Sequence, residues 1–385
     1  MFRREIPLAW LQLIRRKGRF LTAIAGIAFA NILILMQLGF QNALYDSNTR
    51  LHNRLNTDLV MLNPTAQNLS NLNTFPRRRL FQAENFSQVI STAPLYASIA
   101  FWKNPQTRKD TSIIVLGFDP LRPAFDLPEL PLNASKILFP DTLLFDRESR
   151  GDYGEAIAQI DEGQRVTTEI LGRQLVLGGL YEVGASFVAD GSVMTSDQNF
   201  LRIFSDRQAG EVSVGLIRLK PGSDVNATAN LIRQNLPDDI TIMTRQEFID
   251  FEADYWRNST SIGFIFSLGV VMGFVVGVII VYQILYSDVS DHLPEYATLK
   301  AMGYHNGYLL SVVSQEAFIL AVSGYIPGYL ISSFLYDLTR NATNLPLLMT
   351  SQLSLFTLFL TILMCAISGA VAMRKLRSAD PADIF

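Results

Sequence analysis

The chain has 385 residues, of which 49% are hydrophobic and 17% are charged, and its formal net charge is −3. Charged residues fall well below their usual share, which indicates that part of the chain lies in a membrane. The basic cluster near the N-terminus is too short and too close to an apolar stretch to indicate nucleic-acid binding. The single cysteine, Cys365, excludes an intrachain disulfide, which fits a bacterial envelope protein better than a eukaryotic secreted one.

Four apolar stretches, each near the roughly 20 residues that a helix needs to cross a bilayer, divide the chain unevenly. They predict transmembrane helices at residues 20–40, 260–286, 308–335 and 353–373. The predicted fold class is an α-helical membrane protein with four transmembrane helices plus a mixed α/β extracytoplasmic domain between the first and second helices.

Residues 1–19 form a predicted cytoplasmic amphipathic segment, in which Ile6, Trp10 and Leu13 recur at helical spacing among arginines. A plain cluster of topogenic charges explains the same residues equally well. The first span contains Ala28-Phe29-Ala30, which is similar to a signal-peptidase site. Because the apolar run continues well past this triplet, we expect an uncleaved anchor.

Residues 41–259 are predicted to form an acidic periplasmic domain with a helical stalk. An apolar stripe at helical spacing extends past the first span to Leu55, and Phe248, Phe251 and Tyr255 repeat that spacing before the second span. Between these stalk helices, a helix is predicted at 225–235 and residues 118–140 are predicted to be irregular. Strands are predicted at 57–62, 112–118, 173–183, 211–219 and 240–243.

Basic residues flank the start of the first span and the end of the last, so the positive-inside rule predicts that both termini are cytoplasmic. The protein is then a multi-pass inner-membrane protein. Residues 287–307 form a cytoplasmic coupling loop, 336–352 a short periplasmic loop and 374–385 a cytoplasmic tail.

Small residues one helical turn apart predict close helix packing, either within the chain or between two copies. They are Gly269, Gly273, Gly277, Gly324 and Gly328. Two polar residues fall inside predicted spans, Glu316 and Asn31. A carboxyl at that depth must face protein, water or a partner, so Glu316 either helps to bind cargo or has a structural role. Asn31 is expected to form an interhelical hydrogen bond.

The cytoplasmic loop contains a predicted short helix that ends at a glycine. Its residues are Glu295, Tyr296, Ala297, Thr298, Leu299, Lys300, Ala301, Met302 and Gly303. Leu299 and Met302 are three apart and are expected to share one face, which would suit docking of a cytoplasmic protein. The alternative is a tight connector between the second and third spans.

Motifs for chemistry are missing from the sequence. There is no P-loop and no Gly-x-Ser-x-Gly elbow. His52, His292 and His305 have no metal-ligand spacing. The acidic residues Asp250, Glu252 and Asp254 are interpreted as a solvated helix face. We therefore predict no catalytic residue, no metal site, no cofactor in this chain and no enzymatic activity of its own.

Residues 295–303 resemble the loop motif Glu-Ile-Gly-x-Leu-(Lys/Arg)-Ala-(Met/Leu)-Gly of the permease family that includes MacB, LolC, LolE and FtsX, with Tyr296-Ala297 in place of Ile-Gly. The third span is similar to the family's Glu-Ala-x6-Gly-x3-Gly pattern. The resemblance covers the whole chain in layout and about a third of it in motifs. It implies one span, a large periplasmic domain and three further spans.

Within this family, residues 3–10 and 294–303 are most similar to DevC-type permeases of glycolipid exporters. That resemblance implies a separate cytoplasmic ABC ATPase subunit carrying ATP and Mg²⁺, a periplasmic membrane fusion protein and a TolC-like outer-membrane channel. Two copies of this chain in a homodimer would present two loops to two ATPase subunits.

The resulting hypothesis is a permease subunit of an ATP-driven exporter, in which ATPase movement at the cytoplasmic loop reaches the periplasmic domain through the stalk. The alternative is an FtsX-like regulator of a periplasmic hydrolase, without transport. An envelope sensor is disfavoured because no cytoplasmic signalling domain is attached.

Overall fold

The computed structural model describes residues 8–15 and 17–378. The chain divides into two compact units, which we call the membrane unit and the α/β unit. The membrane unit comprises Met1–Asn42, Ile262–Asn341 and Leu347–Phe385. The α/β unit comprises Ala43–Ser261 and the short segment Ala342–Pro346. The fold class predicted from the sequence is confirmed, since a mixed α/β domain lies between the first and second of four apolar helices.

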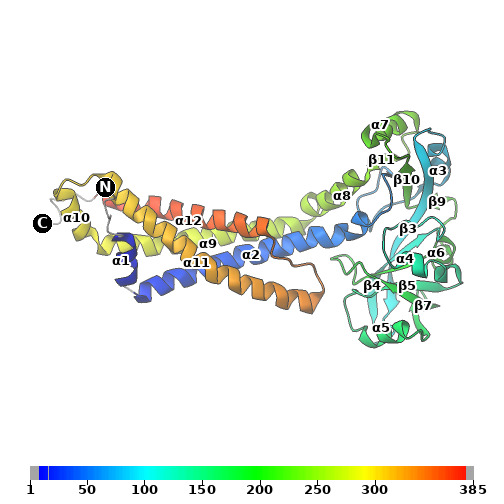
Figure 1. Cartoon of the computed structure of the whole chain (residues 1–385), viewed down its shortest axis with the longest axis horizontal. Helices are drawn as coiled ribbons and strands as arrows, with labels where there is room; N and C mark the ends of the chain where they lie inside the picture. Colours follow the sequence, from blue (N-terminus) through cyan, green and yellow to red (C-terminus); the bar gives the residue numbers. More distant parts are fainter. Residues whose placement is uncertain (1–7, 16, 379–385) are drawn as a thin grey trace. The chain divides into compact units, whose positions relative to one another are not determined.

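Long helices form the membrane unit (Figure 1). Among the described residues, four helices are long and apolar enough to cross a membrane. In chain order the helices are α1 (Leu8–Arg15), α2 (Lys17–Asn53), α9 (Ser261–Asp291), α10 (Leu293–Ala301), α11 (Asn306–Thr343) and α12 (Ser351–Ser378). The predicted N-terminal amphipathic segment lies partly in α1, and its residues 1–7 and 16 fall outside the described residues.

The helices differ in extent from the predicted spans. Helix α2 continues without a break to Asn53, as the apolar stripe beyond the first span predicted. Helix α11 continues to Thr343, so the loop before α12 is shorter than the predicted 336–352. Before α9, the helix α8 (Arg245–Asp254) and the π-helix η2 (Tyr255–Ser259) end at Thr260, whose backbone is extended. The second stalk helix is therefore not continuous with the second span.

Strands and short helices make up the α/β unit (Figure 1). The strands are β1 (Leu59–Leu62), β2 (Phe75–Pro76), β3 (Val89–Lys103), β4 (Asp110–Phe118), β5 (Thr142–Asp146), β6 (Val166–Ile170), β7 (Arg173–Tyr181), β8 (Ser192–Ser196), β9 (Glu211–Val212), β10 (Val214–Leu219) and β11 (Thr241–Thr244). The remaining helices are α3 (Arg78–Ala83), α4 (Leu130–Asn133), η1 (Lys136–Leu138), α5 (Gly154–Asp161), α6 (Asp197–Ile203) and α7 (Val225–Asn235).

Strand β3 organises the sheet. Within the described part of the chain, nine strands pair in the order β11-β1-β10-β3-β4-β8-β5-β7-β6, and β6 pairs again with β3. The 15 residues of β3 are long enough to pair with β10 at one end and with β6 at the other. The pairings β3-β4-β8-β5-β7-β6 therefore close into a ring, and β11-β1-β10 extends the sheet from the side of β3.

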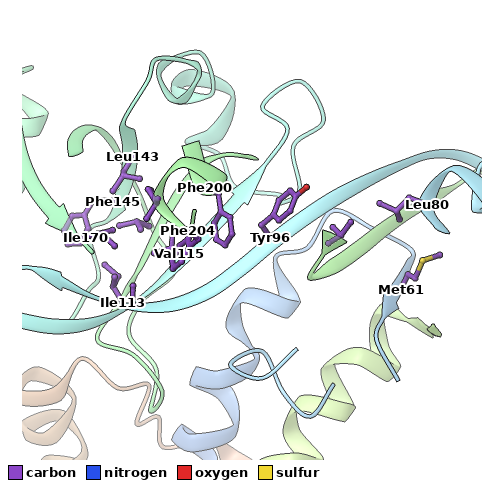
Figure 2. Packing of buried hydrophobic residues seen from close by; sticks show 14 of the residues in the cluster. Met61, Leu80, Tyr96, Ile113, Val115, Leu143, Phe145, Ile170, Phe200 and Phe204 are labelled. Carbon is purple, nitrogen blue, oxygen red and sulfur yellow. The ribbon is translucent and has the colours of Figure 1, made fainter. Parts of the chain in front are cut away.

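Alternating side chains of the sheet build two hydrophobic clusters. On β4, Ile113 and Val115 join one cluster, while Ile114 and Leu116 join the other. Successive side chains of a strand point to opposite faces, so apolar residues at every position indicate a sheet covered on both sides. Figure 2 shows the first cluster, in which Tyr96 and Phe200 stack with ring centroids 5.4 Å apart.

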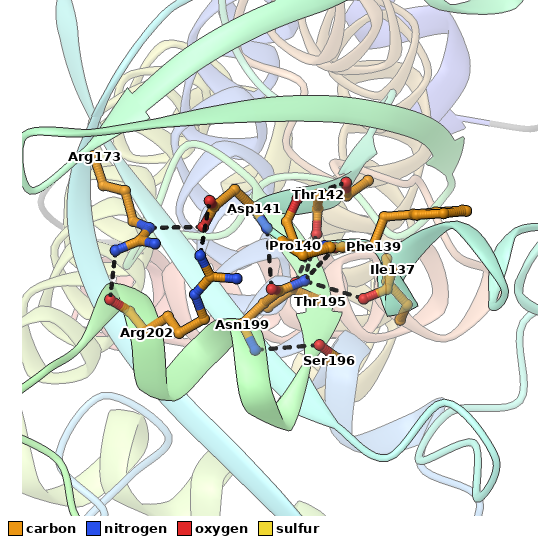
Figure 3. A network of polar contacts seen from close by, with 10 residues as sticks. All are labelled: Ile137, Phe139, Pro140, Asp141, Thr142, Arg173, Thr195, Ser196, Asn199 and Arg202. Atoms are coloured by element: carbon orange, nitrogen blue, oxygen red, sulfur yellow. Dashed lines mark hydrogen bonds and ion pairs between the residues drawn. The ribbon is translucent and has the colours of Figure 1, made fainter.

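The predicted irregular region, residues 118–140, contains only the short helices α4 and η1. Its end is held by Asn199 at the start of α6, whose Nδ2 donates to the carbonyl oxygens of Ile137 and Phe139 at 3.1 and 2.9 Å (Figure 3). The neighbouring Asp141 has a backbone φ of 58° and pairs with Nε of Arg173 at 2.7 Å. The hydrogen bond from this guanidinium lowers the pKa of Asp141. A loop without regular hydrogen bonds is thus fixed by side chains.

Candidate functional site

Helix α10 lies between the second and third spans in the chain and contains most of the predicted coupling residues. It begins beside His292, whose carbonyl accepts from the Tyr296 N–H at 3.0 Å, and Pro294 occupies its first turn, where a missing N–H costs nothing. It ends before Gly303, which has a φ of 94°. The N–H of Tyr304 returns to the carbonyl of Leu299 at 3.1 Å. The glycine therefore ends the helix in the way the sequence predicted.

One face of α10 is packed and the other is exposed. Tyr296 is 1% exposed and belongs to a cluster with Val289, Val313 and Met373. Glu295 and Thr298 are exposed, and Met302, just beyond the helix, is 64% exposed. The remaining predicted coupling residues Ala297, Lys300 and Ala301 lie in α10 but outside the side chains that the structure describes.

Leu299 and Met302, which are expected to share one docking face, differ in their exposure. Leu299 is only partly exposed and packs against the Tyr296 cluster, whereas Met302 is 64% exposed. Met302 lies one residue beyond α10, although its N–H still donates to the carbonyl of Thr298 at 3.0 Å. Among the side chains that the structure describes, Glu295, Thr298 and Met302 are exposed residues of this loop, and Leu299 anchors the helix.

The glycines of the second span pack against α2 and α12. A Cβ built on Gly273 would lie 3.0 Å from Cγ1 of Ile34, and one built on Gly269 would lie 2.5 Å from Cδ of Gln37. At Gly277 the neighbours are Ala30 and Met364. Going from Gly269 to Gly277 along α9, the residue numbers of the facing α2 residues fall from Gln37 to Ala30. Helices α2 and α9 are therefore antiparallel neighbours.

The glycines of the third span also face α2. A Cβ on Gly324 would lie 2.6 Å from Cβ of Ile27, and one on Gly328 would lie 2.9 Å from Cβ of Asn31. Here the residue numbers of the facing pairs rise together along the two helices, so α2 and α11 run parallel. The sequence left open whether the glycine seam lies within the chain or between copies. In this structure all five glycines contact helices of the same chain, with α2 at the centre.

Asn31 forms an interhelical contact inside this seam. It is completely buried, and its Oδ1 accepts from the hydroxyl of Thr361 on α12 at 2.6 Å. The same hydroxyl also lies 2.7 Å from the carbonyl oxygen of Thr357 within α12, so its single proton has two acceptors within reach. Because Asn31 also lies against Gly328 of α11, one polar side chain ties three helices together.

Glu316 is also completely buried, in the first part of α11. Among the described residues, neither of its carboxyl oxygens has a hydrogen-bond partner. Its neighbour in sequence, Ala317, packs in the cluster that contains Leu285 of α9 and Leu320. The side chain is therefore enclosed by helices of the membrane unit, and no surface for cargo reaches it in the described part of the chain.

The acidic face predicted for α8 is only partly solvated. Asp250 and Asp254 are exposed as expected, but Glu252 is 1% exposed. Its Oε2 accepts from the N–H of Leu69 at 2.8 Å, and Oε1 accepts from the indole of Trp256 at 2.8 Å. His52 of α2 lies beside it. Glu252 is therefore a buried structural carboxylate, which is a correction to the solvated interpretation.

The three histidines lie far apart in the chain and have different surroundings. His52 faces Glu252, His292 lies beside Asp288, and His305 is exposed. Among the described residues, no three His, Cys, Asp or Glu side chains are grouped to hold a metal ion.

Comparisons with known proteins give one family match and a likeness to two solved structures. No curated protein matches it. The crystal structure of the periplasmic region of MacB from Actinobacillus actinomycetemcomitans covers 52% of this chain and 94% of its own, with 10% identity and a TM-score of 0.34. The extracellular domain of the noncanonic ABC-type transporter YknZ from Gram-positive bacteria covers 49% of this chain and all of its own, with 11% identity and a TM-score of 0.31.

A family model named FtsX-like permease C-terminal matches residues 239–381. The match begins at β11 and includes α8, the spans α9, α11 and α12, and the loop helix α10 between the first two of these spans. The C-terminal part of this chain, with the candidate coupling residues inside it, is thus similar to the C-terminal domain of FtsX-like permeases.

Proposed function

We propose that this chain is the permease subunit of an ATP-driven ABC exporter that works by mechanotransmission. The observation that carries the proposal is the FtsX-like permease match over residues 239–381, which includes α10 and its exposed residues. A separate cytoplasmic ABC ATPase would bind there and supply ATP hydrolysis with Mg²⁺. The protein is then a multi-pass protein of the inner membrane, with both termini in the cytoplasm.

The proposed force path begins at α10. Tyr296 and Leu299 pack against Val289 of α9 and Val313 of α11, so a push on α10 acts on both spans at once. These spans pack through their glycines against α2. Helix α2 is one continuous helix of 37 residues, and from Ala43 onward it belongs to the α/β unit. A continuous helix of this length can carry a displacement along its axis from one unit to the other.

The finer form of the proposal is a DevC-type exporter. In that form a homodimer of this chain acts with a periplasmic membrane fusion protein and a TolC-like outer-membrane channel, and the substrate is lipid-like, with a glycolipid as the candidate. Motif similarity in the sequence supports this form, especially residues 294–303, which lie inside the family match.

The docking role is tested by changing the exposed face of α10 alone. The variant Met302→Asp places a charge on a 64% exposed residue, and we expect loss of ATPase binding with normal membrane insertion. Leu121→Asp is the matched control, because Leu121 is 83% exposed in the α/β unit and lies outside the family match. Unchanged ATPase co-purification in the Met302 variant would contradict the docking role of α10.

Export and regulation are separated by the partners that co-purify with the full chain in mild detergent. A membrane fusion protein together with an ABC ATPase is the expected result. Capture of a periplasmic hydrolase and no membrane fusion protein would overturn export in favour of an FtsX-like regulator.

A further inference from the structure

The connection between α11 and α12 is held by the α/β unit. Its residues Ala342–Pro346 cluster with that unit and not with the membrane unit. Thr343 is the last residue of α11, and Asn344, which follows it, has a φ of 52° that turns the chain. Leu345 is 7% exposed. The segment is therefore a turn that packs against the α/β unit, whereas the sequence predicted only a short loop.

The guanidinium of Arg150 contacts this turn through one nitrogen and the loop at residues 186–190 through its other two. Its Nε donates to the carbonyl oxygen of Thr343 at 2.8 Å. Its Nη2 donates to the carbonyl oxygen of Ser186 at 2.8 Å, and its Nη1 lies 3.3 Å from Oδ1 of Asp190. Beside it, Nδ2 of Asn344 donates to the carbonyl oxygen of Ser149 at 3.4 Å. The planar fork of arginine suits such a junction, and lysine could not reproduce it.

The arginine is itself held in a fixed position. Its backbone N–H donates to the carbonyl of Asp190 at 2.6 Å, and the hydroxyl of Ser149 donates to the carbonyl of Asp146 at 2.6 Å. Gly191 approaches the same loop so closely that a Cβ there would meet Cα of Ser149 at 3.2 Å. The residues around Arg150 thus lie in the segment that follows β5 and the segment that precedes β8, and both strands belong to the ring.

The contact also satisfies the end of α11. The last four carbonyls of a helix have no partner inside the helix, and a cation near them interacts favourably with the helix dipole. Thr343 supplies one of these carbonyls, and Arg150 supplies both the donor and the charge. The arginine is therefore a cap for α11 from 193 positions away in sequence.

We propose that Arg150 is the positioning residue that fastens the α11–α12 connection to the α/β unit, so that movement of the third and fourth spans reaches the β5–β8 part of the sheet. This inference rests on the proposed mechanotransmission. It adds a second mechanical path to the one through α2. This second path runs from α11 and α12 through Arg150 to the β5–β8 part of the sheet.

The docking is tested first by a disulfide that does not depend on the proposed function. The pair Ser149→Cys and Asn344→Cys is placed in the full chain in membranes, with Cys365→Ala as background. We expect rapid cross-linking with Arg150 present and about tenfold slower cross-linking in Arg150→Ala, since hydrogen bonds to charged groups are among the stronger ones. Failure to cross-link with Arg150 present, or equal rates in both proteins, would overturn the fastening.

The coupling is tested in the exporter reconstituted with its ATPase. Arg150→Ala is expected to keep ATPase binding but to lose most export per ATP hydrolysed, and the disulfide is expected to restore it until reductant is added. Arg147→Ala is the matched control, because Arg147 has an exposure similar to that of Arg150 and pairs instead with Asp161 and Glu182. Full export by Arg150→Ala would overturn the inference, whereas absence of ATPase binding in the unmodified chain would contradict only the proposed function.

Discussion

Nε2 of His52 lies 3.4 Å from Oε2 of Glu252, and both side chains are 1% exposed. His52 comes from the end of α2, and Glu252 comes from α8 just before the second span. The imidazole also packs on Phe248, with ring centroids 4.4 Å apart. The Glu252 carboxylate thus lies between α2, which leads into the α/β unit, and α8, which lies near the end of that unit in the chain.

Replacing Glu252 should destabilise this joint. In Glu252→Ala, the N–H of Leu69 and the indole N–H of Trp256 lose their acceptor while buried, and His52 loses its partner. Leaving a buried donor without its acceptor costs about 1–3 kcal/mol, whereas a change at a solvent-exposed position usually alters the free energy of unfolding by no more than about 0.5 kcal/mol. Asp250→Ala, on the exposed face of the same helix, is therefore the control. Denaturant unfolding of the full chain measures the difference, and equal losses for both variants would contradict the buried role.

Asp146 at the end of β5 predicts a pH dependence of stability. Burial raises the pKa of its carboxyl to about 6, against the opposing effect of hydrogen bonds from the N–H groups of Val183, Gly184 and Glu148 and from the Ser192 hydroxyl. The folded protein therefore holds a proton that the unfolded chain has already lost. Between about pH 4 and pH 6 this group makes the free energy of unfolding fall as the pH rises.

The variant Asp146→Asn tests that slope. It removes the ionisation, so its unfolding free energy should vary less between pH 4 and pH 6 than that of the unmodified chain. Its free energy of unfolding should also be lower at every pH, because the amide NH₂ of asparagine would face N–H donors that in the unmodified chain meet a carboxylate. Denaturant midpoints at several pH values give both quantities. A slope equal to that of the unmodified chain would contradict the assignment to Asp146.

Local signals predicted much of the α/β unit. The helix predicted at 225–235 is α7, whose N-cap Asp224 accepts from the N–H of Ala227 at 3.0 Å. The strands predicted at 112–118 and 173–183 correspond to β4 and β7. Strand β3 is not among the predicted strands, and it contains Pro94, a residue that normally argues against a strand interior. In the structure Pro94 lies opposite Gly215 of β10, where the sheet's long-range pairing overrides the local signal.

The site could be predicted only in part, for different physical reasons. Glu252 could have been found, because it is four residues after the apolar Phe248 and two from Asp250, and helix positions two apart do not share a face. The helix that packs against the glycines could not be predicted, because the spacing of the glycines defines a helix face but not the helix that covers it. Arg150 carries no local signal at all, since its partners are set by the fold.

Gly184 and Gly163 form a matched pair for testing the contact between α2 and the sheet. Both have positive φ, 103° and 76°, so alanine is strained at either position. At Gly163 a Cβ would meet nothing within 4 Å, whereas at Gly184 it would meet the guanidinium of Arg50 and Cβ of Glu148. Gly163→Ala should cost about 1–2 kcal/mol, and Gly184→Ala should cost more. Unfolding of the two variants side by side gives the difference, and equal costs would argue against a close Arg50 contact.

Gly328 offers the corresponding test in the membrane unit. A Cβ there would lie 3.1 Å from the carbonyl oxygen of Ala28 and 3.3 Å from its Cα, so backbone would have to move. Gly328→Ala should therefore separate α11 from α2 and lower the thermal stability of the purified chain, despite the better helix propensity of alanine. Gly307→Ala is the control in the same helix, because nothing lies within 4 Å of that position. It should be neutral or slightly stabilising, and a Gly328 variant that behaves likewise would contradict the α2–α11 seam.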